Sequence, residues 1–446
     1  MRPEIELITA SAPIHASSAD IDRIDHLLYE VTDWNFLLDM MVKNCAAGLL
    51  YRKLPLLKNN NLIPIETQKL LKKAYQTTFI HNTRIYTEFV YLKEVLQLHS
   101  IPFLTLKGIC MAEWLYGDIG LRQMSDIDLL IHEEDGVRCL DSLHAAGYVS
   151  QQEFMVDAFV DAKSQNHFNP LFRNDVMVEI HIRLQNTREI YQQNLKEVWR
   201  DAVSITLNAV ETLRLELSDM LIHACLHLDK HFVTEGVQFT SFNDIVNLLR
   251  GIDNGQQTTD DGKRVKSKES RLKIEEIEDF WERFDAKCIQ YNFADTVFTY
   301  LIVVAHYYKA PLPQYLVDKY SSLLNEEVKN RFENFLAGTG NEFIGRGAPK
   351  SATEAHLRHL KQLRNPVDFM RYVKGVVFPG KEFMISKYIE NKEPRTKNQD
   401  DRKDTSSHHH IVISKFWWLW YPYRYYCGIK GFWYVVTGNT EKKKEK

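Results

Sequence analysis

The sequence predicts an α+β protein in which a small mixed β-sheet core is embedded in a mostly helical chain. Apolar residues recur at spacings of three and four up to about residue 99 and again after about residue 213, as one face of a helix requires. Between about 100 and 185 they alternate with polar residues, and glycines and prolines separate the short segments. The 446 residues exceed one ordinary core, so we expect more than one domain.

Composition narrows the class of protein. Hydrophobic residues make up 44% and charged residues 26%, as in globular proteins, and the net charge of −3 lacks the basic excess of a dedicated nucleic-acid binder. The six cysteines form no C-x-x-C pair, which favours reduced thiols in the cytoplasm over a disulfide or zinc framework. We expect no secretory signal and no membrane span, because the longest apolar run is far below the roughly 20 residues that cross a bilayer.

Residues 1–99 are predicted to form an N-terminal helical region. Its longest helix begins near Pro64, because proline is tolerated in a first helical turn. It continues to Leu98 without an internal proline or glycine.

Residues 100–210 are predicted to form the α/β core. The stretch "PFLTL" is a short strand, Gly108 ends it, "ICMAEWLYG" is compatible with a helix, and "SDIDLLI" is a second strand. A further helix follows near 137–146. The segments "FNPLFRND" and "VMVEIHIRL" then predict a hairpin, with Asn174 and Asp175 as its turn.

Residues 211–390 are predicted to form a C-terminal helical domain, with a mobile loop near 253–272. That loop and a polar linker at 391–410 carry too few apolar residues to offset the entropy of ordering them. Residues 411–446 form a tail rich in tryptophan and tyrosine with a few basic residues. The tail either contacts a membrane surface or docks on the helical domain, and the size of its apolar surface favours docking.

Two carboxylates lie at the N-terminal end of the second predicted strand. Because alternate residues of a strand face the same side, Asp126 and Asp128 point together, whereas Ile127 and Leu129 point into the core. Two carboxylates forced together repel, unless one holds a proton or a cation intervenes. Mg²⁺ suits this place because it prefers oxygen ligands. The alternative is a strand start with two solvent-exposed acids.

The surroundings of the two aspartates favour the metal interpretation. Lys107 and Gly108 lie between a strand and a helix start, where backbone N–H groups attract phosphate. Strand alternation in "VMVEIHIRL" presents Glu179 as a third carboxylate, with His181 as a rival on the same face. Three acids and a phosphate cradle indicate two-metal phosphoryl transfer. We expect Gly108→Val to block phosphate binding with little loss of fold.

The order "LKG…LY…LR…SDIDLLI", followed by "VEIHIRL", resembles a bacterial nucleotidyltransferase family of the polymerase-beta-like superfamily. The resemblance covers about 20–250 and implies a two-magnesium enzyme that transfers a nucleoside monophosphate from an NTP. The acceptor is open: a small molecule, a protein or an RNA end. The resemblance implies that the metals bind to Asp126, Asp128 and Glu179. It implies that the nucleotide binds to Lys107, Gly108, Arg122 and Ser125.

The sequence also departs from the family pattern. Ile109 follows Gly108 where the superfamily usually has glycine or serine, and Glu179 stands where the family more often has aspartate. Two other interpretations follow: a degenerate protein that binds a nucleotide or a partner without catalysis, and a membrane-peripheral adaptor that uses the tail.

Two further sets of residues have two interpretations each. Arg122 either clamps a triphosphate or neutralises the two aspartates as a structural ion pair. His223, His227 and His231 recur at a spacing of four on one helix face, with Asp244 following, and either bind zinc or play a structural or substrate-lining role. We favour the second interpretation, because the pattern lacks a convincing fourth ligand.

Overall fold

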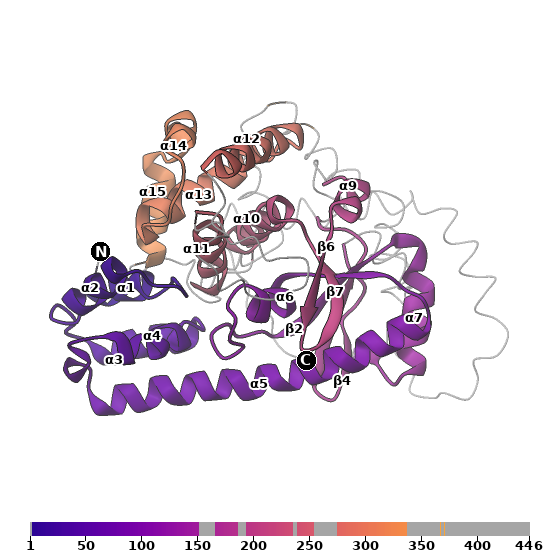
Figure 1. Ribbon diagram of the computed structural model, residues 1–446, viewed down its shortest axis with the longest axis horizontal. Helices are drawn as coiled ribbons and strands as arrows, with labels where there is room; N and C mark the ends of the chain where they lie inside the picture. Colours follow the sequence, from indigo (N-terminus) through magenta and orange to yellow (C-terminus); the bar gives the residue numbers. More distant parts are fainter. Residues whose placement is uncertain are drawn as a thin grey trace, which may run out of the picture. The chain divides into compact units, whose positions relative to one another are not determined.

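The computed structural model describes residues 2–150, 166–185, 193–234, 239–253 and 274–336, together with 366 and 370 (Figure 1). The predicted linker at 391–410, the tail and all but Asp253 of the predicted loop at 253–272 lie outside these residues. The chain divides into two units. Unit 1 comprises Met1–Val149, Phe172–Glu179 and Gln193–Ala348; unit 2 comprises Ser150–Leu171, Ile180–Gln192 and Pro349–Lys446.

The N-terminal part of unit 1 is helical. Helix α2 begins with a capping box, in which Ser17 accepts from the backbone N–H of Asp20 while the Asp20 carboxylate accepts from that of Ser17. Pro64 immediately precedes the long helix α5. Helix α5 runs from the region of α3 and α4 to α7 (Figure 1). The helices here are α1 Pro3–Ala10, α2 Ser18–Leu27, α3 Trp34–Lys43, α4 Ala47–Lys53 and α5 Ile65–Leu98, with short 3-10 turns η1 Leu54–Leu56 and η2 Asn60–Leu62.

Within the described residues, one mixed sheet of seven strands, in the order β3-β4-β5-β2-β1-β7-β6, forms the α/β core and confirms the α+β fold class. Strand β1 pairs antiparallel with β2 and parallel with β7. Strands β2 and β5 are neighbours, which brings the two predicted acidic segments side by side. The strands are β1 Phe103–Thr105, β2 Asp126–Ile131, β3 Val149–Ser150, β4 Leu171–Arg173, β5 Val176–His181, β6 Val203–Leu207 and β7 Val210–Arg214.

Two hairpin turns have left-handed backbones. Asn174 and Asp175, with φ of 49° and 59°, connect β4 to β5, so the predicted hairpin is confirmed. Asn208 and Ala209, with φ of 47° and 64°, connect β6 to β7. Such angles match the twist of paired strands, and asparagine tolerates them better than most residues do. The second hairpin is absent from the predicted elements, although "VSITLNAVETL" carries both the alternation and the turn residue.

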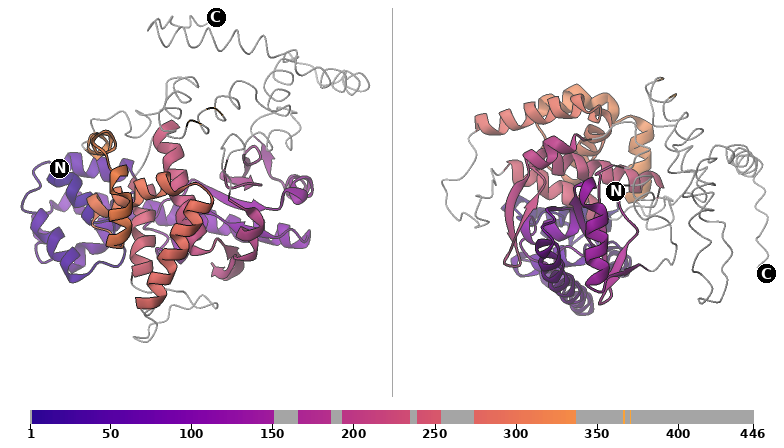
Figure 2. Two further views of the ribbon diagram at one scale, coloured as in Figure 1. Left: turned by 90° about the horizontal axis from the view of Figure 1, so that it is seen from above. Right: turned by 90° about the vertical axis from the view of Figure 1, so that its right-hand side faces the viewer.

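The remaining helices flank the sheet or follow it. Rings of α10, α11 and α15 pack together, with Phe242 and Phe332 centroids 5.2 Å apart and Phe242 and Phe335 also 5.2 Å apart. The views in Figure 2 show the magenta-to-orange helices side by side. Among the described helices, none combines the length and apolar character needed to span a membrane. These helices are α6 Lys107–Trp114, α7 Gly136–Ala145, α9 Leu195–Arg200, α10 Leu217–Thr234, α11 Phe239–Asp253, α12 Ile274–Gln290, α13 Ala294–Tyr308, α14 Gln314–Tyr320 and α15 Glu326–Leu336, with η3 Glu133–Asp135 and η4 Ser321–Leu323.

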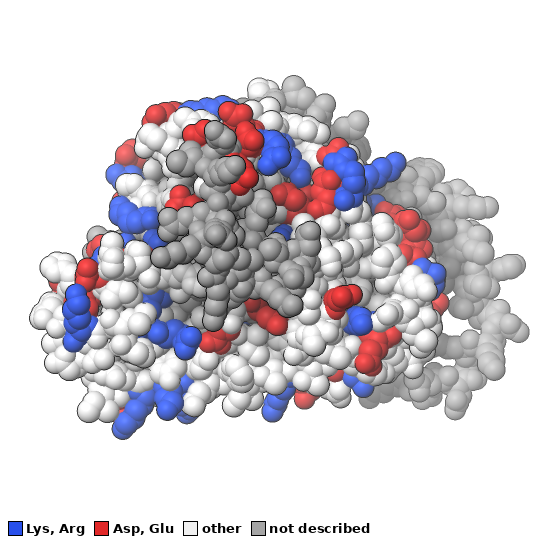
Figure 3. Space-filling model, viewed as in Figure 1, with Lys and Arg blue, Asp and Glu red and all other residues white. Residues whose placement is uncertain are grey.

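Charge is distributed evenly on the visible surface. On the face drawn in Figure 3, lysine and arginine side chains of the described residues lie interspersed with aspartate and glutamate. This mixture agrees with the near balance of acids and bases in the sequence. It gives that face no extended basic surface of the kind that binds nucleic-acid backbones.

Lys53, at the end of α4, is a buried cation. Its side chain is 3% exposed and its Nζ donates to the backbone oxygens of Ser11 at 2.8 Å and Leu49 at 3.2 Å. Burial lowers the pKa of Lys53 to about 7, while the Asp20 carboxylate opposes that shift and Arg250 adds to it. Lys53 therefore connects α4 to the end of α1 through carbonyl groups instead of an ion pair.

The free energy of unfolding should rise with pH between about 7 and 10.5, because the unfolded chain keeps Lys53 protonated there and the folded protein does not. Below this range both states hold the proton, and the contribution is constant. Relative to Lys53→Met, wild type should gain up to about 1.4 kcal/mol per pH unit, measured by urea denaturation. A difference between the two proteins that is independent of pH would contradict a depressed pKa for Lys53.

Candidate active site

The carboxylates come from the two neighbouring strands β2 and β5. Asp126 begins β2 and is partly exposed, whereas Asp128 is 2% exposed. Asp128, Glu179 and His181 each offer a ligand atom, and these atoms all lie within 4.8 Å of one another. The arrangement therefore brings the predicted acid and its predicted rival, the imidazole, to the same side of β5.

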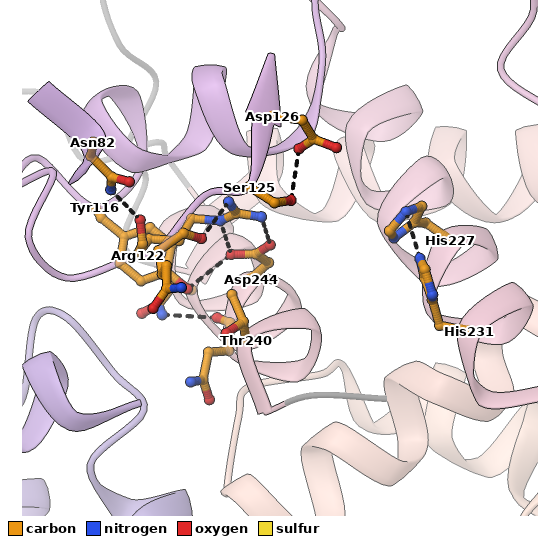
Figure 4. Close-up of polar contacts among 12 residues, drawn as sticks. Asn82, Tyr116, Arg122, Ser125, Asp126, His227, His231, Thr240 and Asp244 are labelled. Atoms are coloured by element: carbon orange, nitrogen blue, oxygen red, sulfur yellow. Dashed lines mark hydrogen bonds and ion pairs between the residues drawn. The ribbon is translucent and has the colours of Figure 1, made fainter. Parts of the chain in front are cut away.

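Asp126 carries the electrostatic signature of a crowded acidic site. Its pKa is raised to about 7, first by burial and then by the nearby charges of Asp128 and Glu179. Lys107 opposes this shift, and so does the Ser125 hydroxyl, which donates to Asp126 Oδ1 at 3.1 Å (Figure 4). Near neutral pH the cluster is therefore ready to take up a proton or a cation at Asp126.

Lys107 faces the carboxylates. Its Nζ lies 2.6 Å from Asp128 Oδ1, and both side chains are largely buried. Burial alone would lower the pKa of Lys107, but the attraction of Asp128, Glu179 and Asp126 outweighs it and raises that pKa. The Lys107 backbone is left-handed, with a φ of 44°, which turns the chain sharply from β1 into α6. A residue predicted to bind phosphate is thus also a counter-charge for the acids.

The Arg122 and Met124 side chains leave little room for a side chain at Gly108. A Cβ atom at Gly108 would lie 2.7 Å from Arg122 Nη1 and 3.0 Å from Met124 Cγ. These close approaches argue against the expectation that valine could replace Gly108 with little loss of fold, which stays a prediction. The physical reason is that Arg122 is held in place and cannot move aside freely.

Arg122 is held by Asp244 of α11. Its Nε donates to Asp244 Oδ1 at 2.9 Å and its Nη2 donates to Oδ2 at 2.7 Å (Figure 4). The Tyr116 hydroxyl donates to the same Oδ1 at 2.9 Å. Burial would lower the pKa of Arg122, but Asp244 raises it further than burial lowers it. If Arg122 had a structural role, the sequence predicted that it would pair with Asp126 and Asp128. In the structure its bidentate partner is Asp244 instead.

Helix α5 fixes the loop that leads into β2. Asn82 donates through Nδ2 to the backbone oxygen of Arg122 at 2.7 Å, and its Oδ1 accepts from the Met124 backbone N–H at 3.3 Å. His81 Nε2 lies 2.9 Å from the Met124 oxygen. These contacts set the direction in which the chain delivers Ser125 and Asp126 to the acidic cluster.

Histidines of α10 line the same region. His227 Nε2 lies 3.0 Å from His231 Nε2 (Figure 4). Burial and the charge of Lys107 hold the pKa of His227 well below its usual value, and Asp128 opposes that shift. Across the described ranges, the group with metal-ligand geometry is Asp128, Glu179 and His181, not the three histidines of α10. This arrangement favours the structural or substrate-lining interpretation of those histidines.

Sequence reasoning missed Asn82, and it considered Asp244 only as a residue that follows the three histidines, not as the partner of Arg122. Asp244 of α11 and Asn82 of α5 both bind to Arg122 in the same loop. In the sequence, Asp244 is 122 residues and Asn82 40 residues away from Arg122. Neither residue belongs to a local motif. Their only sequence signal is a polar residue on a helix face that is otherwise buried, since Asn82 is 0% and Asp244 5% exposed.

Comparison with known protein families identifies a family for this chain. A protein-family model described as an uncharacterised nucleotidyltransferase matches residues 30–280, which is more than half of the chain. The matched range contains Lys107, the three acids, Arg122 and Asp244. No curated protein and no solved structure matches the chain.

The contact between Gly108 and Arg122 can be tested by stability. Alanine elsewhere in a helix stabilises it relative to glycine, but Gly108→Ala should cost about 1 to 3 kcal/mol of unfolding free energy, because the new Cβ meets the guanidinium. In an Arg122→Met background the cost should shrink, which a double-mutant cycle measured by chemical denaturation would detect. Equal effects of Gly108→Ala in both backgrounds would show that Arg122 does not impose the glycine.

Proposed function

The chain belongs to the family of uncharacterised nucleotidyltransferases, and from that premise we propose that it transfers a nucleoside monophosphate from an NTP to an acceptor in a reaction that depends on Mg²⁺. We propose residues 100–210 as the catalytic core and 211–390 as a helical domain that completes the pocket. Asp126, Asp128 and Glu179 would hold two Mg²⁺ ions. The observation that carries this proposal is the grouping of Asp128 and Glu179 within 4.8 Å, with the pKa of Asp126 raised by both and Lys107 Nζ 2.6 Å from Asp128.

The donor set fits magnesium. Carboxylate oxygens are the ligands that Mg²⁺ prefers, and the mutual repulsion of Asp126, Asp128 and Glu179 is relieved by a divalent cation. The nearby imidazole of His181 suits a transition metal better than Mg²⁺. We therefore propose the carboxylates as ligands and His181 as a neighbour that contacts substrate or supports packing.

The reaction exchanges one bond at phosphorus for another. The acceptor oxygen forms a bond to the α-phosphorus, the bond from that phosphorus to the leaving pyrophosphate breaks, and the acceptor proton leaves. Bound Mg²⁺ would neutralise charge on the phosphates and lower the pKa of the acceptor. The chain's own contribution is orientation and charge: the acids set the position of the cations, and Lys107 adds a positive charge beside Asp128.

The triphosphate would bind where β1 turns into α6. The first N–H groups of a helix attract anions, and we propose Lys107, Gly108, Arg122 and Ser125 as its partners. Ile109 is fully buried, so its side chain cannot contact phosphate as a serine at this position could. That arrangement supports the second candidate function, a protein that binds a nucleotide or partner without turnover. The intact acids favour the enzyme.

Acceptor and location are part of the proposal. A small molecule, a protein side chain and an RNA end all supply a suitable acceptor group. The five described cysteines, Cys45, Cys110, Cys139, Cys225 and Cys288, are free thiols, which supports the cytoplasm as the compartment. The alternative of a membrane-surface adaptor depends on the tail at 411–446, which lies outside the described residues. Sedimentation with anionic liposomes, with and without 411–446, would test it.

The proposed role of Glu179 separates oxygen ligation from imidazole ligation. Incubation with each NTP labelled at the α-phosphate, with Mg²⁺, should give pyrophosphate release or labelled product in wild type. Glu179→Gln keeps the size of the side chain but removes its charge, so turnover should fall at least about 100-fold, as when charge stabilisation of a transition state is removed. His181→Asn should lower turnover less than about tenfold.

Thermal unfolding of both variants provides the control for folding. The carboxylate assignment fails if Glu179→Gln retains near-normal transfer that depends on Mg²⁺. It also fails if His181→Asn is the variant that loses metal binding. Binding of an NTP by wild type without any transfer would favour the nucleotide-binding protein over the enzyme.

A further inference from the structure

Asp244 belongs to α11, outside the strands and turns that carry the other proposed site residues. We infer that Asp244 is a positioning residue for triphosphate binding, because it holds the Arg122 guanidinium so that Nη1 faces the turn at Gly108. This inference rests on the proposed function. Its geometric basis is the bidentate pair, with Arg122 Nε and Nη2 at 2.9 and 2.7 Å from the two Asp244 oxygens.

The donors of Arg122 divide into two groups. Nε and Nη2 are directed at Asp244, whereas Nη1 contacts the Gln123 backbone oxygen at 3.5 Å, the outer limit of a hydrogen bond. Nη1 stands 2.7 Å from the point where a Cβ of Gly108 would be. It therefore lies against the first turn of α6, whose N–H groups have no partner within the helix. A phosphate at that turn would meet both kinds of donor.

The surroundings make this orientation rigid. Arg122 is 9% exposed and Asp244 5% exposed, so neither is pulled away by solvent. The Tyr116 hydroxyl holds Asp244 Oδ1 at 2.9 Å, and Asn82 holds the Arg122 backbone oxygen at 2.7 Å. A planar guanidinium held at two nitrogens keeps its third nitrogen in one direction. Asp244 of α11 thereby determines the direction in which Arg122 Nη1 points.

The charge of Asp244 and its positioning of Arg122 act on phosphate affinity in opposite directions. A carboxylate close to a phosphate repels it, so removal of the Asp244 charge would strengthen binding if field strength alone mattered. Removal of the Asp244 charge weakens phosphate binding only if the orientation of Arg122 contributes more binding free energy than the repulsion from Asp244 costs. The direction of the change in affinity therefore distinguishes positioning from simple charge.

The chain offers a matched control on the same helix. Arg250 of α11 binds Asp20 of α2, with Nη1 to Oδ2 at 2.9 Å and Nη2 to Oδ1 at 3.0 Å. This pair is bidentate and largely buried, with side-chain exposures of 17% and 15%. Asp20 is no part of the proposed catalytic or binding residues. Asp20→Asn therefore removes an equivalent charge from an equivalent pair with no phosphate-binding turn beside it.

The test is the affinity for non-hydrolysable α,β-methylene analogues of the four NTPs with Mg²⁺, measured by calorimetry on the full chain, with the corresponding monophosphates in parallel. Asp244→Asn should weaken triphosphate binding at least about tenfold and monophosphate binding less than about threefold, because the missing orientation concerns the outer phosphates. Asp20→Asn should leave both affinities unchanged while lowering the melting temperature. Tyr116→Phe, which only loosens Asp244, should weaken triphosphate binding by about threefold.

Unchanged triphosphate affinity in both Asp244→Asn and Tyr116→Phe would overturn the inference, and so would tighter binding by Asp244→Asn. If Asp244→Asn does not fold, Tyr116→Phe alone decides the result. Failure of wild type to bind any of the four analogues overturns the proposed function and the inference with it. Binding by wild type that the variants leave unchanged overturns the inference alone.

Discussion

Repulsion among the carboxylates of β2 and β5 is the constraint on which the rest of the site depends. Burial and the charges of Asp128 and Glu179 together raise the pKa of Asp126 to about 7. Lys107 partly offsets this repulsion, because its Nζ lies 2.6 Å from Asp128 Oδ1. The pKa of Asp126 stays raised although Lys107 opposes the shift, so a further cation near Asp126 would relieve the repulsion. A site that binds and transfers phosphate with divalent cations has the electrostatics that these residues display.

The helices outside the sheet take part in the site. Asn82 of α5 fixes the backbone before β2, and Asp244 of α11 fixes the side chain of Arg122. The charge of Lys107 lowers the pKa of His227 of α10, and the charge of Asp128 raises it. Each of these residues acts on the loop or the cluster from a different helix. The α/β core therefore supplies the acids, and the helices determine how the groups around them are oriented.

Local patterns predicted the parts of the site that depend on local geometry. Alternation along a strand placed Asp126 with Asp128 and Glu179 with His181, and the Asn174–Asp175 turn followed from its residue types. Pairings between distant segments left no such pattern. The partner of Arg122 is 122 residues away, and the need for glycine at 108 comes from that arginine. Lys107 was expected at a phosphate, but its contact with Asp128 became visible only when β1 and β2 were paired.

The most direct test of the account is a crystal structure of the protein with Mn²⁺ and an α,β-methylene NTP analogue, with Mn²⁺ located by anomalous scattering. We expect two peaks with Asp126, Asp128 and Glu179 oxygens about 2 Å away, and the triphosphate at the first turn of α6 beside Arg122 Nη1. Mn²⁺ bound instead by the histidines of α10, or a nucleotide bound away from Gly108, would contradict the account.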